Sequence, residues 1–145
     1  MHEAKMKILV VDDETDVELL FRQKFKKEIR SGDIEFQFAF SAESAIDVLN
    51  EQLSSEIVLI LSDINMPGMN GLELLKYIKA TLPHLSVFML TAYNDEKNYQ
   101  LAQEYGADRY ITKPLDFNVI KQNIIEYQGS KSADAQKNKQ IYFNI

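Results

Sequence analysis

The sequence predicts an α/β fold in which helices cover both faces of a five-stranded parallel sheet. Short apolar runs alternate five times with longer segments whose apolar residues recur at helical spacing. The run 57–61 has no polar alternation, as is typical of a central strand that is buried on both faces. Alternating strands and helices of this kind imply right-handed crossovers between parallel strands.

Length and composition fit one ordinary domain. The 145 residues are 46% hydrophobic and 26% charged, enough to bury about two thirds of the unfolded surface. The chain has no cysteine, which excludes disulfides, zinc fingers and thiol catalysis. A net charge of -6 argues against direct nucleic-acid binding. The N-terminus holds too few apolar residues for a signal peptide or a membrane span, so we expect a cytoplasmic protein.

The first expected elements are a strand over 6–11 and a long helix. Thr15 and Glu18 have the spacing of a capping box at the start of that helix, and Gly32 closes it. The apolar residues of one helix face are Val17, Leu20, Phe21, Phe25 and Ile29.

The next elements are a strand near the sheet edge, a helix and the central strand. Apolar and polar residues alternate over 34–40, so this strand keeps one partly polar face. Ser41 is placed to cap the helix that follows. The inward residues of that helix are Ala45, Ile46, Leu49 and Leu53.

The second half of the chain supplies two more strands and three helices. The helix between these strands has a poor apolar stripe, mainly Leu101, Ala102 and Tyr105, so we expect it to move at low energetic cost. The expected order is a helix over 71–82, a strand over 87–91, the weak helix over 95–105, a strand over 108–112 and a final helix capped by Asp116.

Polar residues stand at the ends of four expected strands: Asp12 with Asp13, Asp63, Thr91 and Lys113. In parallel α/β sheets, ligands bind beyond the carboxyl ends of the strands. Three carboxylates within about 6 Å would repel by roughly 3 kcal/mol per pair at an effective dielectric near 20. Lys113 and a hard divalent cation, Mg²⁺ by its preference for oxygen ligands, would compensate this charge. The set suits phosphoryl transfer to an aspartate.

The order and spacing of these residues resemble the receiver domain of response regulators in two-component signalling. The similarity runs from about Lys5 to Tyr127. It implies a flavodoxin-like (βα)5 fold with strand order 2-1-3-4-5 and a receiver domain over 1–128. The residues that follow, 129–145, form a polar stretch with an apolar tip, which we expect to be a linker or a tail. The motifs that carry it are Val11-Asp12-Asp13-Glu14, Asp63-Ile64-Asn65-Met66-Pro67 with Gly71, Thr91-Ala92, and Tyr110 followed by Lys113-Pro114.

The resemblance implies a role for five polar residues of these motifs. Asp63 would be the phosphoacceptor and would bind Mg²⁺ together with Asp12 and Asp13. Asn65 would add its backbone carbonyl to the metal site. Lys113 would pair with the phosphoryl group.

The resemblance also implies a switch, in which Thr91 hydrogen-bonds a phosphoryl oxygen and Tyr110 changes rotamer with it. We expect Asn65 and Tyr93 to modulate the reaction rates, because the bulk of Tyr93 would obstruct attack by water on the acyl phosphate. The Lys113-Pro114 bond is expected to be cis.

The function that follows from the resemblance is a phosphorylation-dependent signalling switch. A sensor histidine kinase or phosphotransfer protein would transfer its phosphoryl group to Asp63 with Mg²⁺, and the face formed by 91–112 would then control an unknown output partner or domain. The chain would not be an enzyme, apart from slow self-dephosphorylation. A homodimer is one expected assembly, and no membrane contact is expected.

Other classes of protein stay open at this point. Each polar residue taken singly has an ordinary structural explanation as a turn or strand-end residue. A phosphohydrolase of the haloacid-dehalogenase type places two carboxylates two positions apart after the first strand, unlike Asp12-Asp13-Glu14. A flavodoxin-like cofactor binder would repel the flavin phosphate at this acidic end. A pseudo-receiver would bind partners without phosphorylation. His84 is expected in an exposed loop and not as a phosphohistidine donor.

Overall fold

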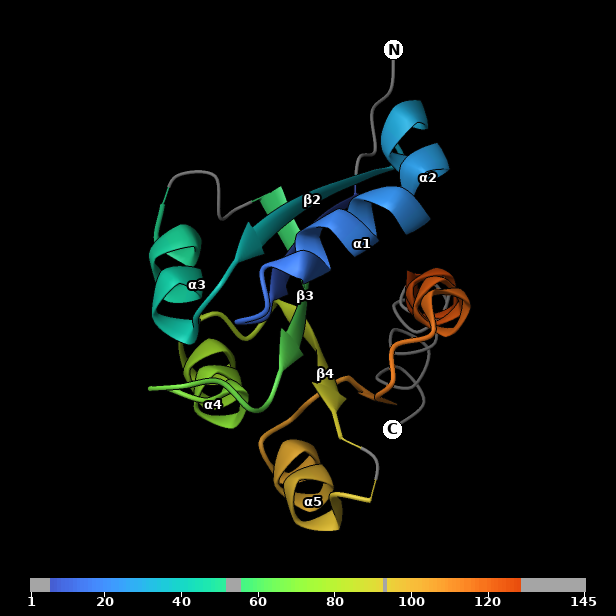
Figure 1. Cartoon of the computed structure of the whole chain (residues 1–145). Coiled ribbons are helices and arrows are strands. Elements are labelled where there is room, and N and C mark those ends of the chain that lie inside the picture. The colour runs from blue at the N-terminus through green and yellow to red at the C-terminus, as the bar shows by residue number, and fades with distance from the viewer. Residues whose placement is uncertain (1–5, 52–55, 93, 129–145) are drawn as a thin grey trace, which may run out of the picture. The chain divides into compact units, whose positions relative to one another are not determined.

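The computed structural model describes residues 6–51, 56–92 and 94–128 (Figure 1). The chain divides into two compact units, Met1–Pro114 and Leu115–Ile145. The first unit holds the whole sheet and all the residues expected at the functional site, and the second holds a helix over 117–128.

The first unit contains a five-stranded sheet in which all neighbouring strands are parallel. Its order, β2-β1-β3-β4-β5, confirms the order 2-1-3-4-5. The register pairs Val11 with Ser62, and Asp63 with Leu90, so three strands end at nearly the same level. The strands are β1 (Met6–Val11), β2 (Ile34–Ala39), β3 (Ile57–Asp63), β4 (Ser86–Thr91) and β5 (Arg109–Thr112).

Helices cover the two faces of this sheet. Buried residues of α3, α4 and α5 share one hydrophobic core with Leu9 and Val11 of β1. On the other face, Phe21 and Phe25 pack edge-on against Phe36 of β2, with ring centroids 5.3 and 4.9 Å apart. The helices of the first unit are α1 (Asp16–Lys24), α2 (Lys26–Ser31), α3 (Ala42–Leu49), α4 (Gly71–Thr81) and α5 (Glu96–Glu104).

The first helix differs from its prediction at both its start and its middle. Thr15 has helical backbone angles and makes no side-chain cap, so the predicted capping box is wrong. Glu18 instead pairs with Arg22, at 2.9 Å between carboxylate and guanidinium. The helix is interrupted at Phe25, which separates α1 from α2. Leu20, expected on the inward face, is 40% exposed.

The other caps follow the sequence. The Ser41 hydroxyl accepts a hydrogen bond from Ser44 N at 3.0 Å at the start of α3. Gly32 ends α2 with a φ of 81°, which glycine adopts without steric cost. In α5 the buried residue is Ala102, which agrees with the predicted weak apolar stripe.

The second unit begins at Leu115, and its helix is capped as expected. Asp116 Oδ1 accepts hydrogen bonds from Asn118 N at 2.9 Å and from Val119 N at 3.4 Å. Of the helices that the structure describes, none has the length and apolar character needed to cross a membrane.

Candidate functional site

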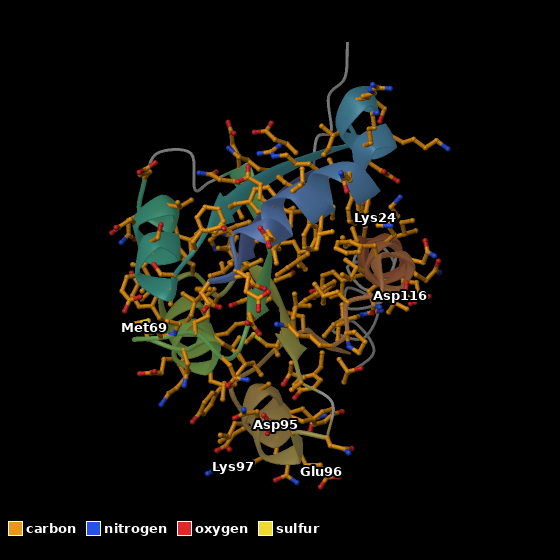
Figure 2. All side chains as sticks on the ribbon, viewed as in Figure 1. Lys24, Met69, Asp95, Glu96, Lys97 and Asp116 are labelled. Carbon is orange, nitrogen blue, oxygen red and sulfur yellow. The ribbon has the colours of Figure 1, made fainter. Side chains whose placement is uncertain are left out.

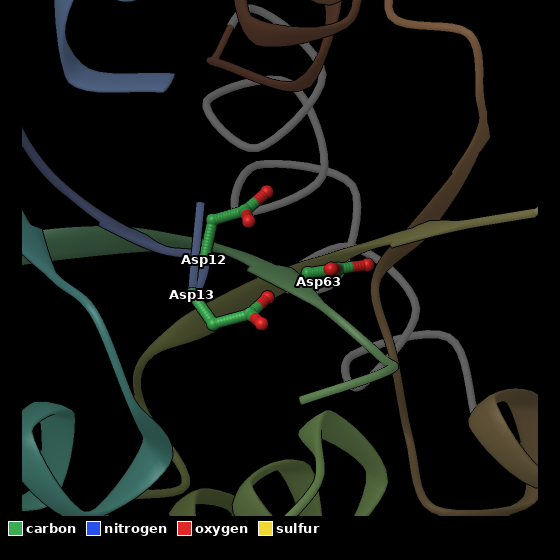
Figure 3. Close-up of side chains that lie close together, drawn as sticks. All are labelled: Asp12, Asp13 and Asp63. Atoms are coloured by element: carbon green, nitrogen blue, oxygen red, sulfur yellow. The ribbon is translucent and has the colours of Figure 1, made fainter. Parts of the chain in front are cut away.

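Three carboxylates converge where β1 and β3 end (Figure 3). Asp63 is the last residue of β3, while Asp12 and Asp13 directly follow β1. One carboxylate oxygen of each lies within 4.8 Å of the others. Asp12 and Asp63 are buried, at 2% and 4% exposure, and Asp13 is exposed. The expected convergence of the three carboxylates is therefore found in this fold.

The Asp63 carboxylate is fixed through one of its oxygens. Asp63 Oδ1 accepts a hydrogen bond from Ile64 N at 2.9 Å and lies 3.1 Å from Lys113 Nζ. Within the described residues, no hydrogen bond engages Asp63 Oδ2. One oxygen is thus held by the protein while the other remains available for chemistry.

Asp12 is a buried carboxylate with incomplete pairing. Its Oδ1 accepts a hydrogen bond from Glu14 N at 2.9 Å. Its Oδ2 is buried without a hydrogen-bond partner among the described residues, and Lys113 Nζ lies 4.0 Å away. Burial raises the pKa of the Asp12 carboxyl above its usual range, and the Asp63 carboxylate adds to this effect against the Glu14 N–H.

Lys113 reaches the carboxylates from the end of β5. Its backbone N–H donates to the Thr91 carbonyl at 2.6 Å, which ties the residue to the end of β4. The bond that follows it, Lys113-Pro114, is cis, as expected. The ammonium lies between Asp63 and Asp12 and supplies one positive charge against three negative ones.

Thr91 and Tyr110 lie on neighbouring strands. Thr91 is fully buried, and its Oγ1 makes no hydrogen bond of good geometry to any residue the structure describes. The Tyr110 hydroxyl donates to the Asp95 carbonyl at 3.4 Å, and its ring meets Tyr99 edge-on at 4.5 Å. Burial raises the pKa of Tyr110, which the nearby Thr91 hydroxyl partly offsets.

The aromatic pair borders a groove at the start of α5, where Figure 2 labels Asp95, Glu96 and Lys97. The groove has a volume of about 310 Å³, and Tyr99 and Tyr110 contribute to its lining. It is a surface feature beside Tyr99 and Tyr110, and none of the three site carboxylates lines it.

Close packing holds the start of α4 against the end of β3. A Cβ added to Gly71 would lie 2.0 Å from the Asp63 carbonyl oxygen, so a larger residue does not fit there. Gly71 N donates to the Ile64 carbonyl at 2.8 Å. Asn70 and Glu73 form a capping box that begins α4. The sequence pattern predicted this helix, but the Asn70-Glu73 box was missed, although its spacing is readable.

The other residues singled out from the sequence are either exposed or outside the described part of the chain. Asn65 is exposed in the loop after β3. Tyr93, Leu53 and the segment 129–145 lie outside the described residues. His84 is exposed in the turn before β4, as expected.

The acidic site has the chemistry of a divalent-cation site. Its donors are oxygens only, its formal charge is negative even with Lys113 present, and Asp12 Oδ2 is a buried oxygen without a hydrogen-bond partner among the described residues. A hard cation with oxygen ligands satisfies both the charge and the unpaired oxygen. The residues therefore fit Mg²⁺.

Comparisons with a family model and with known proteins point to the same family. A family model for the response regulator receiver domain matches residues 8–125. The sporulation initiation phosphotransferase F of Bacillus subtilis is 33% identical over 126 residues, which are 87% of this chain and 96% of that relative. The response regulator protein FleR of Pseudomonas aeruginosa is 36% identical over 114 residues, which are 79% of this chain and 23% of FleR.

A solved structure agrees with the sequence relatives. The response regulator protein TrrA from Thermotoga maritima, in complex with Mg²⁺-BeF, superposes with a TM-score of 0.68 at 28% identity. The match covers 83% of this chain and 97% of that chain. The match therefore spans nearly all of the TrrA chain but less than a quarter of the length of FleR.

Proposed function

Because the chain belongs to the response regulator receiver domain family, we propose that Asp63 is the residue that accepts the phosphoryl group. Receiver domains act in phosphorylation-dependent two-component signalling as phosphoacceptors and are generally not classed as enzymes. The observation that carries the assignment is the convergence of Asp63, Asp12, Asp13 and Lys113 at one edge of the sheet.

In the proposed reaction, an Asp63 oxygen attacks the phosphorus of a phosphohistidine on a kinase or phosphotransfer protein. The new O–P bond forms as the P–N bond breaks, and the imidazole leaves with the electron pair and takes up a proton. We assign the attack to Asp63 Oδ2, since Oδ1 is occupied by Ile64 N and Lys113 Nζ. These donors hold the carboxylate in one orientation.

Asp12 and Asp13 are the proposed metal ligands, together with Asp63 and the backbone carbonyl of Asn65. A bound Mg²⁺ would neutralise the charge that gathers on the phosphoryl oxygens during transfer. Lys113 would move from the carboxylate toward a phosphoryl oxygen once Asp63 carries the acyl phosphate, because the ammonium then faces a dianion.

A direct test is incubation with acetyl phosphate and Mg²⁺, followed by intact mass measurement. We expect one phosphoryl adduct on the wild type and none on Asp63→Asn. The matched control is Asp47→Asn, which removes an exposed carboxylate from α3 and should be labelled like the wild type. Labelling of Asp63→Asn to the same extent, or labelling that persists in EDTA, would contradict the assignment.

The proposed switch connects Asp63 to the face formed by 91–112. The buried Thr91 hydroxyl, which lacks a good hydrogen bond within the described part of the chain, would gain one to the phosphoryl group. Tyr110 would then leave its contact with the Asp95 carbonyl at the N-cap of α5. Since α5 buries little apolar surface, a coupling of about 1–3 kcal/mol would suffice to shift its position.

Amide exchange in α5 with and without beryllofluoride tests this switch. We expect altered protection across Glu96–Glu104 in the wild type. Thr91→Ala should bind beryllofluoride yet leave the exchange of α5 unchanged, because the hydroxyl that links the two sites is missing. Identical protection in the wild type with and without beryllofluoride would exclude the switch.

The partners and setting of this function are also proposals. The kinase or phosphotransfer protein supplies the phosphoryl group, the α5 face addresses an output partner or domain, and slow hydrolysis of the acyl phosphate resets the switch. We place this activity in the cytoplasm, where ATP is available to the kinase. The receiver boundaries 1–128 and a homodimer stay predictions.

A further inference from the structure

The loop between β3 and α4 carries Asn65, the proposed backbone ligand of the metal site. Its two ends are held locally. Ile64 is fixed by hydrogen bonds to Leu90 O and from Gly71 N, and Asn70 is fixed in the capping box of α4. Neither of these contacts holds the backbone of the segment 65–69 itself, so the position of its carbonyls depends on a further contact.

That contact comes from Glu43, in the first turn of α3. Glu43 Oε2 accepts a hydrogen bond from Met69 N at 3.1 Å, across 26 residues of sequence. Figure 2 shows Met69 beside α3 and α4. Among the described residues, this is the one hydrogen bond found from another element to the segment 65–69.

The fit around this carboxylate is tight. Gly68 has a φ of 73°, and a Cβ placed there would lie 2.9 Å from Glu43 Oε2. The absence of a side chain at Gly68 lets the loop approach α3 closely enough for the bond to form. Met66 and Met69 also contact the hydrophobic core, so their side chains support the same segment from the inside.

We propose that Glu43 is a positioning residue for the phosphorylation site, which sets the loop that supplies the Asn65 carbonyl and so tunes Mg²⁺ affinity. The inference rests on the proposed function of Asp63. A carboxylate accepting a backbone N–H makes a charge-assisted hydrogen bond. The hydrogen bonds from its own N–H and from Met69 N lower the pKa of Glu43, because they favour the ionised carboxylate that accepts them.

The variants Glu43→Ala, Glu43→Gln and Asp47→Ala separate the possible causes. Glu43→Ala removes the acceptor and the charge, while Glu43→Gln keeps an acceptor of the same reach and removes the charge. Asp47→Ala removes an exposed charge one turn further along α3. All three changes lie on the surface of one helix.

The first readout is hydrogen exchange of the Met69 amide in metal-free protein. We expect Glu43→Ala to speed this exchange by about three- to tenfold, because the amide loses its acceptor. Glu43→Gln, which keeps a weaker neutral acceptor, should lie closer to the wild-type rate than Glu43→Ala does, and Asp47→Ala should match the wild type. Equal exchange in Glu43→Ala and the wild type would overturn the inference.

The second readout is Mg²⁺ affinity by titration calorimetry. Removing a group that orients a metal ligand directly weakens binding by about 10–100-fold, and an exposed carboxylate acting through a loop should cost about two- to fivefold. We expect that loss in Glu43→Ala and recovery in Glu43→Gln. An equal loss in Glu43→Gln and Asp47→Ala would assign the effect to charge alone and reject the positioning role.

These experiments separate the two proposals. If the wild type neither binds Mg²⁺ nor accepts a phosphoryl group from acetyl phosphate, the proposed function itself fails. If the wild type does both and Glu43→Ala matches it in Met69 exchange and in Mg²⁺ affinity, the positioning role alone fails.

Discussion

Asp12→Asn should stabilise the metal-free protein and remove much of its response to Mg²⁺. The Asp12 carboxylate lies within 4.8 Å of Asp63, which costs about 3 kcal/mol at an effective dielectric near 20. By the same relation, the attraction between Asp12 Oδ2 and Lys113 Nζ, 4.0 Å apart, stabilises the charge by about 4 kcal/mol. The partial exposure of the lysine side chain reduces this attraction. These two terms nearly cancel, so the repulsion from the exposed Asp13 and the cost of burying the charge remain.

Asparagine at position 12 keeps the stabilising hydrogen bond and removes the destabilising buried charge. Its side-chain oxygen still accepts from Glu14 N, and the buried group no longer carries a charge. We expect the free energy of unfolding to rise by about 1–2 kcal/mol without metal. For a chain of this size that corresponds to an increase in Tm of about 3–8 °C.

The pH dependence has a defined sign. The pKa of Asp12 is raised in the folded state, so the folded protein binds more protons than the unfolded chain between the usual and the raised pKa. The stability of the wild type therefore falls as pH rises through this window. The advantage of Asp12→Asn should be full at neutral pH and should disappear as pH approaches the ordinary range of an aspartate, near 4.

The assay is thermal unfolding followed by circular dichroism, in EDTA and in excess Mg²⁺, over pH 4 to 7.5. Mg²⁺ should raise the Tm of the wild type well above that of Asp12→Asn, which reverses their order. Asp13→Asn, at the exposed carboxylate, is the control and should gain less without metal. A metal-free Asp12→Asn protein that is less stable than the wild type at neutral pH would refute the reasoning.

Three further changes test other parts of the structure. Gly71→Ala places a Cβ 2.0 Å from the Asp63 carbonyl oxygen, so we expect a loss of more than about 2 kcal/mol in stability and slower labelling by acetyl phosphate; wild-type values in both would show that the loop adapts freely. Lys79→Met removes an ammonium that donates to Leu85 O at 2.9 Å and to Asp108 Oδ2 at 2.8 Å, and should lower stability by about 1–2 kcal/mol in urea unfolding while labelling of Asp63 stays unchanged. Tyr93→Ala should shorten the life of the acyl phosphate, measured by loss of the mass adduct after the donor is removed; an unchanged half-life would remove Tyr93 from the account.

The sheet and the acidic site could be predicted because each depends on local signals. Apolar runs without alternation mark the strands, and their carboxyl ends must meet at one edge of a parallel sheet. This rule is enough to bring Asp12, Asp13, Asp63 and Lys113 together before any distance is known. The strand order needed the family resemblance, because periodicity does not determine which strands are neighbours.

The errors and omissions involve choices among competing local interactions. Glu18 had the spacing to reach back to Thr15, but Arg22 lies one turn ahead and takes its carboxylate instead. The bond between Glu43 and Met69 joins residues far apart in sequence, and no periodic pattern signals it. Such contacts depend on how helices pack, which the spacing of apolar residues leaves undetermined.

The Lys79 contacts have a consequence for building reporters from this domain. Asp108 Oδ2 also accepts a hydrogen bond from Val87 N. Hydrogen bonds therefore join the beginnings of β4 and β5, at the end of the sheet opposite to Asp63. We therefore expect displacement along these strands to be concentrated at their other ends, near Thr91 and Thr112. A fluorophore attached at the exposed His84, in the turn before β4, should be a silent reference, while one attached on the outer face of α5 should report phosphorylation.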